Sequence, residues 1–181
     1  VESLIKLGLL NWNIGQIKKS SRILEKALSV TEKAQINEKK DKVSDYIQIY
    51  EFYHAGKDSL REEDYQKAIK DFEKAIELAR KIKSEEHELK CLRELSLSHL
   101  YQDDIDTFLS LNQEALEIAR RIRHRQEEGR CLFNIGYYYD IKESYSQALR
   151  HYEEALNIAR LVQDYRDESQ CLTNIGEIFI Q

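Results

Sequence analysis

The stretch that decides the fold is residues 131–160, which read CLFNIGYYYDIKESYSQALRHYEEALNIAR. Apolar residues recur there every three to four positions in two separate runs, and this spacing places them on one face of an α-helix. A few polar residues separate the runs. Among them, Ser144 followed by Gln147 has the form of a capping box, which starts a helix by satisfying free backbone N–H groups. The stretch predicts two helices joined by a short turn.

The same skeleton recurs along the chain every 40 residues, the spacing of Cys91, Cys131 and Cys171 (131 − 91 and 171 − 131). Three further sets share this interval: Leu92, Leu132 and Leu172; Gly56, Ser96, Gly136 and Gly176; and Ala75, Ala115 and Ala155. An earlier copy holds Gly8 and Ala27 at an offset of 48 (56 − 8), which predicts eight extra residues at that junction. Two-helix repeats of this length indicate a solenoid, in which each unit buries its apolar face by stacking on its neighbours.

Small residues recur where two helices are expected to cross closely. A glycine inside a helix costs about 1 kcal/mol relative to alanine, so its recurrence implies that another helix approaches the backbone there. The third copy departs from this pattern, with Ser96 in place of glycine and Phe108 in place of alanine. We expect a wider helix pair or a shifted crossing angle in that copy.

The composition fits an elongated helical protein. Charged residues make up 34% of the chain and hydrophobic residues 41%, with no proline and 6 glycines, which favours long helices and short connections. The net charge of −5 gives no case for nucleic-acid or membrane binding, and no apolar run predicts a transmembrane helix. The chain starts at Val1, lacks methionine and ends at Gln181 inside an apolar helical pattern, so we expect it to be part of a longer protein.

The three cysteines invite a metal or disulfide interpretation, but they occupy one slot in successive copies. Packed helix axes lie about 8–10 Å apart, whereas a disulfide needs Cα atoms within roughly 7 Å. Zinc spacing of the Cys-x-x-Cys kind is absent. We interpret the cysteines as small buried apolar residues in a reducing compartment, which predicts a cytoplasmic location.

Nothing in the sequence predicts catalysis, a cofactor or a metal site. The five histidines are scattered, and neither a glycine-rich phosphate loop nor a His-Glu-x-x-His motif is present. A basic cluster could bind phosphate or an acidic partner; it consists of Arg120, Arg121, Arg123, Arg125 and Arg130. We favour the interpretation that these arginines lie at a helix C-terminus, which attracts cations, and that Glu127 and Glu128 are their counter-charges. We therefore expect a protein that is not an enzyme.

The repeat resembles the tetratricopeptide repeat (TPR) family. Its hallmark pattern is met by Leu132, Ile135, Gly136, Tyr139, Tyr145, Ala148, Tyr152 and Ala155, and in an earlier copy by Phe52, Gly56, Tyr65, Ala68, Phe72 and Ala75. The usual period is about 34 residues. The longer form is similar to LGN-type scaffolds, bacterial Rap-type peptide-sensing regulators and bacterial proteins that join TPR arrays to ATPase or CHAT protease domains. With these it shares Ala159, Arg160, Asp164, Glu168 and Leu172.

The resemblance implies an all-α fold, a right-handed superhelical solenoid of antiparallel helix pairs. It predicts one array over residues 1–181, with repeats at about 1–36, 37–83, 84–123 and 124–163 and a partial repeat at 164–181. The partial repeat lacks a second helix to cover its apolar residues, which are Leu172, Ile175, Ile178 and Phe179. Terminal repeats need a polar cap, so we expect the chain to self-associate or fray at this end.

The resemblance also implies a non-catalytic scaffold that binds an unidentified protein or peptide in the concave groove of the superhelix. The first helix of each pair should line this groove with Tyr50, Tyr53, Lys57, Lys90, Arg93, Leu97, Arg130, Phe133, Asn134, Tyr137, Gln170, Asn174 and Glu177. An asparagine can bond both the N–H and the C=O of an extended peptide. For any single residue, an ordinary solvent-facing position is the alternative. Two other functions stay open: a regulatory array that gates an attached ATPase, protease or DNA-binding effector, and a structural spacer that self-associates.

Overall fold

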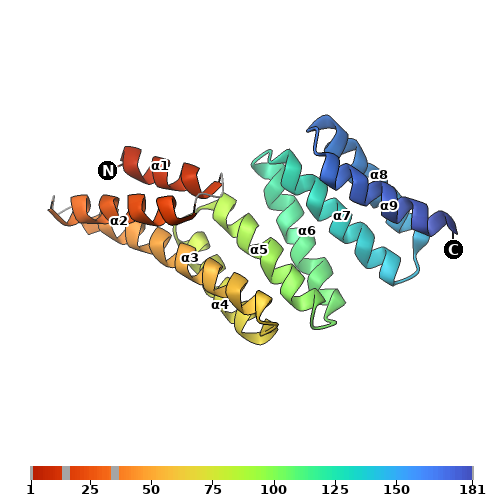
Figure 1. The fold of residues 1–181 in the computed structure, drawn as a ribbon, viewed down its shortest axis with the longest axis horizontal. Helices are drawn as coiled ribbons and strands as arrows, with labels where there is room; N and C mark the ends of the chain where they lie inside the picture. Colours follow the sequence, from red (N-terminus) through yellow and green to blue (C-terminus); the bar gives the residue numbers. More distant parts are fainter. Residues whose placement is uncertain (1, 14–16, 34–36, 181) are drawn as a thin grey trace. The chain divides into compact units, whose positions relative to one another are not determined.

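The computed structural model describes residues 2–13, 17–33 and 37–180, and the regular elements in these ranges are nine helices (Figure 1). They are α1 (Glu2–Asn13), α2 (Ile17–Lys33), α3 (Asn37–Arg61), α4 (Tyr65–Lys81), α5 (Glu85–Leu100), α6 (Ile105–Arg121), α7 (Arg125–Ile141), α8 (Tyr145–Leu161) and α9 (Tyr165–Ile180). The prediction of an all-α fold is confirmed.

The chain divides into two compact units, Val1–Glu88 and Leu89–Gln181, with the boundary inside α5. In the first unit, α2 packs against α1 and α3, and α3 packs against α4. In the second unit, α7 packs against α6 and α8, and α8 packs against α9. Each unit is thus built from consecutive helices that run in opposite directions, as the repeat predicts.

Turns of one form set the 40-residue period. Each holds a residue with positive φ, between 56° and 62°, and these residues are Glu63, Lys83, Asp103, Arg123, Glu143 and Gln163. After α7, the N–H of Glu143 donates to the carbonyl of Asp140 and the N–H of Ser144 to that of Tyr139. These are the paired bonds of a Schellman motif. Helices of 17 residues with three-residue turns give 20 residues per helix and 40 per pair.

The residue that closes each turn also begins the next helix. The carboxylates of Asp64, Asp104 and Asp164 accept the backbone N–H three positions on, at 3.1–3.2 Å. The capping box predicted at Ser144 is wrong: its side chain makes no cap bond. The N–H of Gln147 already donates to the carbonyl of Ser144, and the serine hydroxyl turns back toward the carbonyl of Lys142.

The eight extra residues predicted at the first junction lie in α3. This helix has 25 residues, whereas α7 has 17, and the difference of eight corresponds to residues 37–44 at its start. The insertion therefore lengthens one helix by about two turns and leaves the turn after it unchanged.

The glycines of the repeat mark close helix crossings, as predicted. A Cβ built on Gly136 would lie 2.7 Å from Cδ1 of Tyr152, and one on Gly56 would lie 2.8 Å from the ring of Phe72. Gly8 receives Leu24 in the same way, at 2.9 Å. Each glycine is thus a socket for a large side chain on the second helix of its pair.

The third copy changes both partners of this contact. Ser96 stands in the glycine slot, and Asn112 stands in the slot of Phe72 and Tyr152 (72 + 40 and 152 − 40). Both Ser96 and Asn112 are buried. A larger residue on the first helix is therefore matched by a smaller one on the second at this contact, while Phe108, also buried, replaces the alanine four positions earlier. The wider pair or shifted crossing angle stays a prediction.

Candidate interaction face

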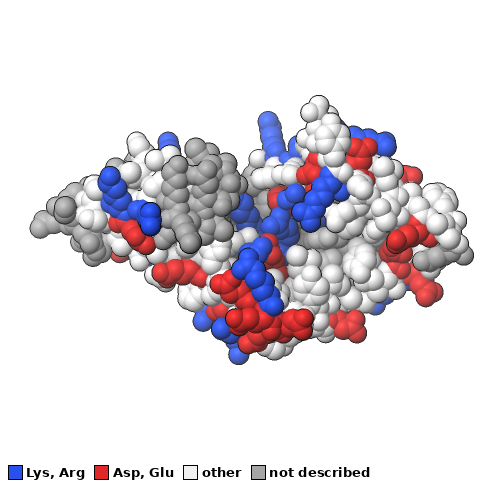
Figure 2. Space-filling view, viewed as in Figure 1, with Lys and Arg blue, Asp and Glu red and all other residues white. Residues whose placement is uncertain are grey.

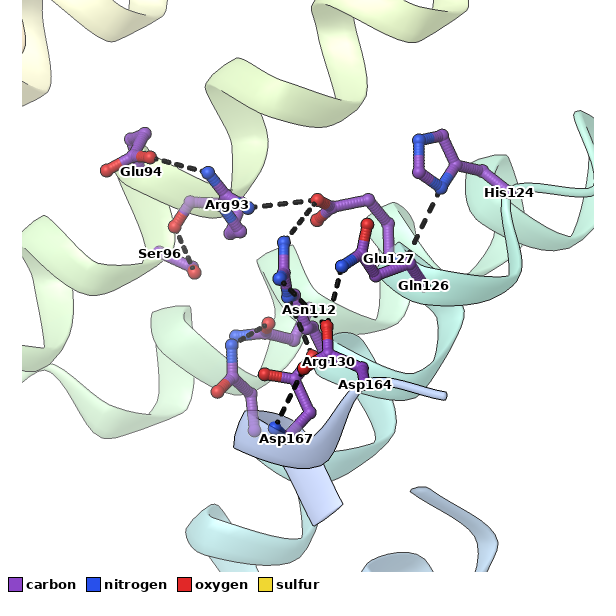
Figure 3. A network of polar contacts seen from close by, with 11 residues as sticks. Arg93, Glu94, Ser96, Asn112, His124, Gln126, Glu127, Arg130, Asp164 and Asp167 are labelled. Carbon is purple, nitrogen blue, oxygen red and sulfur yellow. Dashed lines mark hydrogen bonds and ion pairs between the residues drawn. The ribbon is translucent and has the colours of Figure 1, made fainter. Parts of the chain in front are cut away.

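In the second unit, polar side chains of the first helices gather on one side. We call this set the polar face: Arg93 on α5; Glu127, Arg130 and Asn134 on α7; and Asp167 and Asn174 on α9. Figure 3 shows most of them in one continuous network. α7 contacts α9 directly, so neighbouring first helices present these groups side by side.

Two arginines tie the first helices together within this face. Arg93 bonds Glu127 at 2.9 Å and Glu94 at 2.8 Å. Arg130 bonds the same Glu127 at 3.1 Å and Asp167 at 2.9 Å. Glu127 is buried, and both guanidinium groups lie against its carboxylate, which would be costly to bury without a partner. Arg93 therefore joins α5 to α7, and Arg130 joins α7 to α9. Contact of both arginines with a ligand stays a prediction.

Asp164 joins this network at the start of α9. Gln126 donates to its carboxylate at 2.6 Å, and the backbone N–H of Asp167 donates at 3.1 Å. These two bonds, with the nearby charge of Arg130, lower the pKa of Asp164 below its ordinary value. The carboxylate therefore stays ionised and caps α9 at neutral pH.

The carboxamide of Asn134 has a fixed orientation. The Nδ2 of Asn112 donates to the carbonyl of Phe108 at 2.7 Å, which leaves the Oδ1 of Asn112 as an acceptor. The Nδ2 of Asn134 donates to that Oδ1 at 2.8 Å. The Oδ1 and second N–H of Asn134 then have no partner among the described residues. Both groups that a peptide backbone needs are present on one side chain.

Asn174 repeats this arrangement one copy later. Its Nδ2 donates to the hydroxyl of Tyr152 at 3.0 Å, and that hydroxyl donates to Asp140 at 3.2 Å. Burial is the main cause that raises the pKa of Tyr152 above its ordinary value, so the hydroxyl keeps its proton. Asn174 is therefore oriented like Asn134, by the residue in the same slot of the preceding second helix.

These supporting residues were missed in the sequence. Asn112, Tyr152 and Asp140 fix the asparagines, but in the sequence Tyr152 was identified only as a member of the hallmark pattern and the other two were not identified. A usable signal was present, because each asparagine follows its supporting residue by 22 positions (134 − 112 and 174 − 152). This spacing links two different copies of the repeat, so a comparison within one copy does not show it.

The other residues predicted on this side have different surroundings. Phe133 packs against the core and its ring lies 5.3 Å from that of Tyr152, whereas Tyr137 is half exposed and its ring meets Phe108 edge-on. On α5, Lys90 and Leu97 are half-buried. On α9, Gln170 and Glu177 are exposed.

Three predicted ligand contacts lie in the first unit. Tyr53 is 8% exposed and its ring packs edge-on against Phe72, so it is a core residue rather than an accessible one. Tyr50 is half-buried beside His54, and Lys57 lies over the ring of Tyr53 at 5.9 Å.

The cysteines and the basic cluster have structural surroundings. Cys91, Cys131 and Cys171 are buried thiols, and burial raises the pKa of Cys131 to about 12. Among the described residues, no group of side chains is arranged to hold a metal ion. Glu128 bonds both Arg120 and Arg125, which confirms the counter-charge interpretation.

The visible surface mixes charges of both signs. Figure 2 shows blue and red side chains next to one another over the part of the chain that contains α5–α9. In the part of the chain that is described, no helix is long and apolar enough to cross a membrane.

Comparison with known proteins gives one family and several similar folds. The family model described as tetratricopeptide repeat matches residues 49–121 and 98–161, and a second model of that description matches residues 1–33. A search of curated protein sequences finds no match.

Among solved structures, a Pyrococcus horikoshii signal transduction ATPase with numerous domains and a TPR sensor is 21% identical, with a TM-score of 0.71. The match covers 99% of this chain but 27% of the length of that protein. BtubC from P. vanneervenii is 21% identical with a TM-score of 0.65, over 99% of this chain and 71% of its own. The TPR domain of Arabidopsis FLU is 24% identical with a TM-score of 0.60, over 66% and 98%. At these identities the likeness concerns the fold.

Proposed function

Because the chain belongs to the tetratricopeptide repeat family, whose repeats form protein-interaction scaffolds, we propose that its polar face binds an extended segment of a partner protein. The observation that carries this proposal is the fixed orientation of Asn134 and Asn174. Both asparagines keep an acceptor and a donor for a ligand, and both are held by a bond from Nδ2. A side chain that is already ordered loses less conformational entropy when it binds.

The spacing of the two asparagines suits an extended backbone. They lie on adjacent first helices, and packed helix axes are about 8–10 Å apart. An extended chain rises about 3.3 Å per residue. Asn134 and Asn174 would therefore bond backbone groups about three residues apart. These contacts recognise the backbone of an extended peptide and do not depend on its side chains.

The charges of this face support binding without an acidic anchor. Arg93 and Arg130 form ion pairs with Glu94, Glu127 and Asp167. Both guanidinium charges are therefore balanced within the chain, and binding needs no carboxylate from the ligand. Peptide specificity would then come from half-exposed groups such as Tyr137 and from the exposed Gln170 and Glu177.

The test uses a peptide selected on the wild-type protein from a displayed random library. Asn134→Ala and Asn174→Ala should each weaken its binding about fivefold, since one hydrogen bond contributes about 1 kcal/mol. Asn157→Ala, which removes an exposed asparagine from α8, is the matched control and should change nothing. Unchanged affinity for both face variants, with intact helicity by circular dichroism, would exclude this face as the binding site.

A second candidate is a sensor array that regulates an attached effector. It is favoured by the likeness to the Pyrococcus horikoshii signal transduction ATPase, which has a tetratricopeptide repeat sensor. If the full-length protein carries an effector domain, adding the selected peptide should change that domain's activity, and Asn174→Ala should shift the peptide concentration required. An effector whose activity is indifferent to bound peptide would exclude this candidate.

A further inference from the structure

Large apolar side chains are exposed in the turn between α8 and α9. Leu161 is 72% exposed and Tyr165 is 76% exposed, and Val162 between them is 37% exposed. All three lie between positions 161 and 165, so they form one apolar patch at this turn. A single exposed apolar side chain is ordinary, whereas several gathered in one place mark interaction sites on soluble proteins.

These positions of the turn stay exposed where further helices follow. The preceding turn of the same kind, between α6 and α7, is followed by α8 and α9, and its counterparts Arg121 and Arg125 are exposed (161 − 40 and 165 − 40). Lys81, the counterpart of Leu161 one copy earlier still, has a side chain that is 63% exposed. A helix pair stacked after α9 in the same manner would therefore leave Leu161 and Tyr165 exposed.

The turn between α6 and α7 supplies positive charge. Its exposed arginines are Arg121, Arg123 and Arg125. Glu128 bonds Arg125 at 2.8 Å and Arg120 at 3.1 Å, so one carboxylate faces two guanidinium groups. Arg123 lies in the turn with positive φ and forms no ion pair among the described residues. The turn therefore carries more positive than negative charge.

The basic turn and the apolar turn lie side by side. Gln126 directly follows the basic turn, and its Nε2 donates to the carboxylate of Asp164 in the apolar turn at 2.6 Å. α7 and α9 begin at these turns and contact each other, and Figure 1 shows both turns at the same end of the second unit. We call the surface that they form the turn edge: Arg121, Arg123, Arg125, Leu161, Val162 and Tyr165.

We propose that the turn edge docks an acidic segment of a partner protein, and that this segment also carries an aliphatic or aromatic side chain. Its carboxylates pair with the arginines, and its apolar side chain covers Leu161 and Tyr165. Arginine and tyrosine are the residue types that are enriched at protein interfaces and that contribute most to binding there. The proposal goes beyond the proposed function, because Asn174 lies nine positions after Tyr165 on α9.

Charge makes other occupants of the turn edge less suitable. A second copy that bound through a two-fold axis would present the same patch, which would bring the arginines of both copies together. A nucleic acid needs a larger basic face, and its phosphates would meet Asp167 and Glu168 in the first turn of α9. An acidic protein segment has the opposite charge to the arginines and can also bury the apolar patch.

The probe comes from a displayed library of random peptides, selected on the whole wild-type chain and depleted on a variant that carries Leu161→Ser and Tyr165→Ser. Surviving peptides should be enriched in aspartate and glutamate and should contain an aliphatic or aromatic residue. Both substituted side chains are exposed, so the variant should keep the thermal midpoint of wild type. The most enriched peptide is then synthesised with a label, and its affinity is measured by fluorescence anisotropy.

Arg123→Glu should weaken binding of this peptide about tenfold at low ionic strength, because it replaces an attraction by a repulsion. The loss should shrink as salt is added, since salt screens exposed charges. Arg150→Glu makes the same change on α8, at a side chain that is 78% exposed, and should bind like wild type. Ile141→Ser removes an exposed apolar side chain at the other end of α7 and should also bind like wild type.

Four results would overturn the proposal. They are the survival of no peptide, survivors without acidic enrichment, unchanged affinity for Arg123→Glu, and a dimer in sedimentation that is lost when Leu161 and Tyr165 become serine. The last result would assign the turn edge to a second copy. Asn174→Ala should leave the affinity unchanged, whereas a loss would place the peptide on the polar face and overturn the proposal. Failure of the proposed function at Asn174 therefore has no bearing on this outcome.

Discussion

α7 and α9 carry one sequence pattern in two environments. Leu132 on α7 is 2% exposed, whereas Leu172, its counterpart 40 residues later, is 46% exposed. Gly136 receives Tyr152, whereas the Cβ position at Gly176 has open space around it. Each helix follows a turn that holds one residue with positive φ, Arg123 before α7 and Gln163 before α9.

This difference shows that the sequence of a repeat determines the helix itself, whereas the neighbouring helix determines how far its apolar side is buried. The 40-residue pattern produces a helix with a leucine, a glycine socket and an aromatic on one side in both cases. Burial of that side depends on the next helix, because each unit of a solenoid contacts its neighbours alone. Substitutions at equivalent positions of α7 and α9 should therefore change the free energy of unfolding by different amounts. The difference measures how much packing against α8 stabilises α7.

The largest inequality is expected at the leucine pair. Leu132→Ala removes a buried side chain and should lower the free energy of unfolding by about 3 kcal/mol, within the range for buried leucines. Leu172→Ala should cost under about 1 kcal/mol, because this side chain is half exposed already. Urea denaturation followed by circular dichroism measures both. Equal losses would mean that Leu172 is buried in solution, by a second copy or by another segment.

Much of this fold follows from the sequence because its signals are local. The 40-residue interval predicts the helix pairs, and the recurring glycines predict the sockets. Asp104 is recognisable as a cap because carboxylates favour that position. The positive φ of Lys83 and Arg123 is not recognisable, since neither residue type prefers the left-handed region.

The candidate face was harder to predict because it depends on contacts between copies. Asn134 and Asn174 were identified by their slot, but their supports lie 22 residues away on other helices. Arg130 was expected to meet a ligand, yet carboxylates from two helices engage it. Helical periodicity gives the side on which a residue lies. It does not give the partner that the side chain reaches across to a neighbouring helix.

The glycine pair should give effects of opposite sign. Gly136→Ala places a methyl group 2.7 Å from the ring of Tyr152 and 3.3 Å from the carbonyl of Ala148. Overpacking of this kind costs about 1–3 kcal/mol, and the better helix propensity of alanine returns up to about 1 kcal/mol, so a net loss of about 1–2 kcal/mol is expected.

Gly176→Ala meets no neighbour and should gain up to about 1 kcal/mol from helix propensity alone. Thermal denaturation of the two variants, side by side with wild type, gives the signs directly. A lowered midpoint for Gly176→Ala would show that the socket is filled in the free protein.

The caps before α8 and α9 should differ by about 1 kcal/mol. Asp164 accepts the N–H of Asp167, so Asp164→Ala should cost about 1 kcal/mol, whereas Ser144 makes no side-chain cap bond and Ser144→Ala should stay within about 0.5 kcal/mol of wild type. Denaturation midpoints at neutral pH check this. A cost for Ser144→Ala as large as that for Asp164→Ala would contradict the assigned bond.

The cap at Asp164 also predicts a dependence on pH. Its pKa in the folded chain lies below the unfolded value of about 3.9, because Gln126 and the N–H of Asp167 donate to the carboxylate. The contribution is therefore full above about pH 5 and is lost as the pH falls through the folded pKa. The stability difference between wild type and Asp164→Ala should shrink as the pH is lowered below about 5, while Ser144→Ala should show no such trend.

The smallest effects on stability are expected in the turns. The turn before α8 and the turn before α9 should respond equally to the same substitution. Glu143 and Gln163 have φ of 56° and 57°, a conformation that costs a non-glycine residue about 1 kcal/mol or more. Glycine removes this strain but loses more freedom on folding, so Glu143→Gly and Gln163→Gly should each gain about 0.5 kcal/mol. Glu153→Gly, on the exposed side of α8, is the control and should lose about 1 kcal/mol. Equal gains before α8 and before α9 would show that turn geometry is local, whereas a gain in one turn alone would mean that the neighbouring helix also sets the turn.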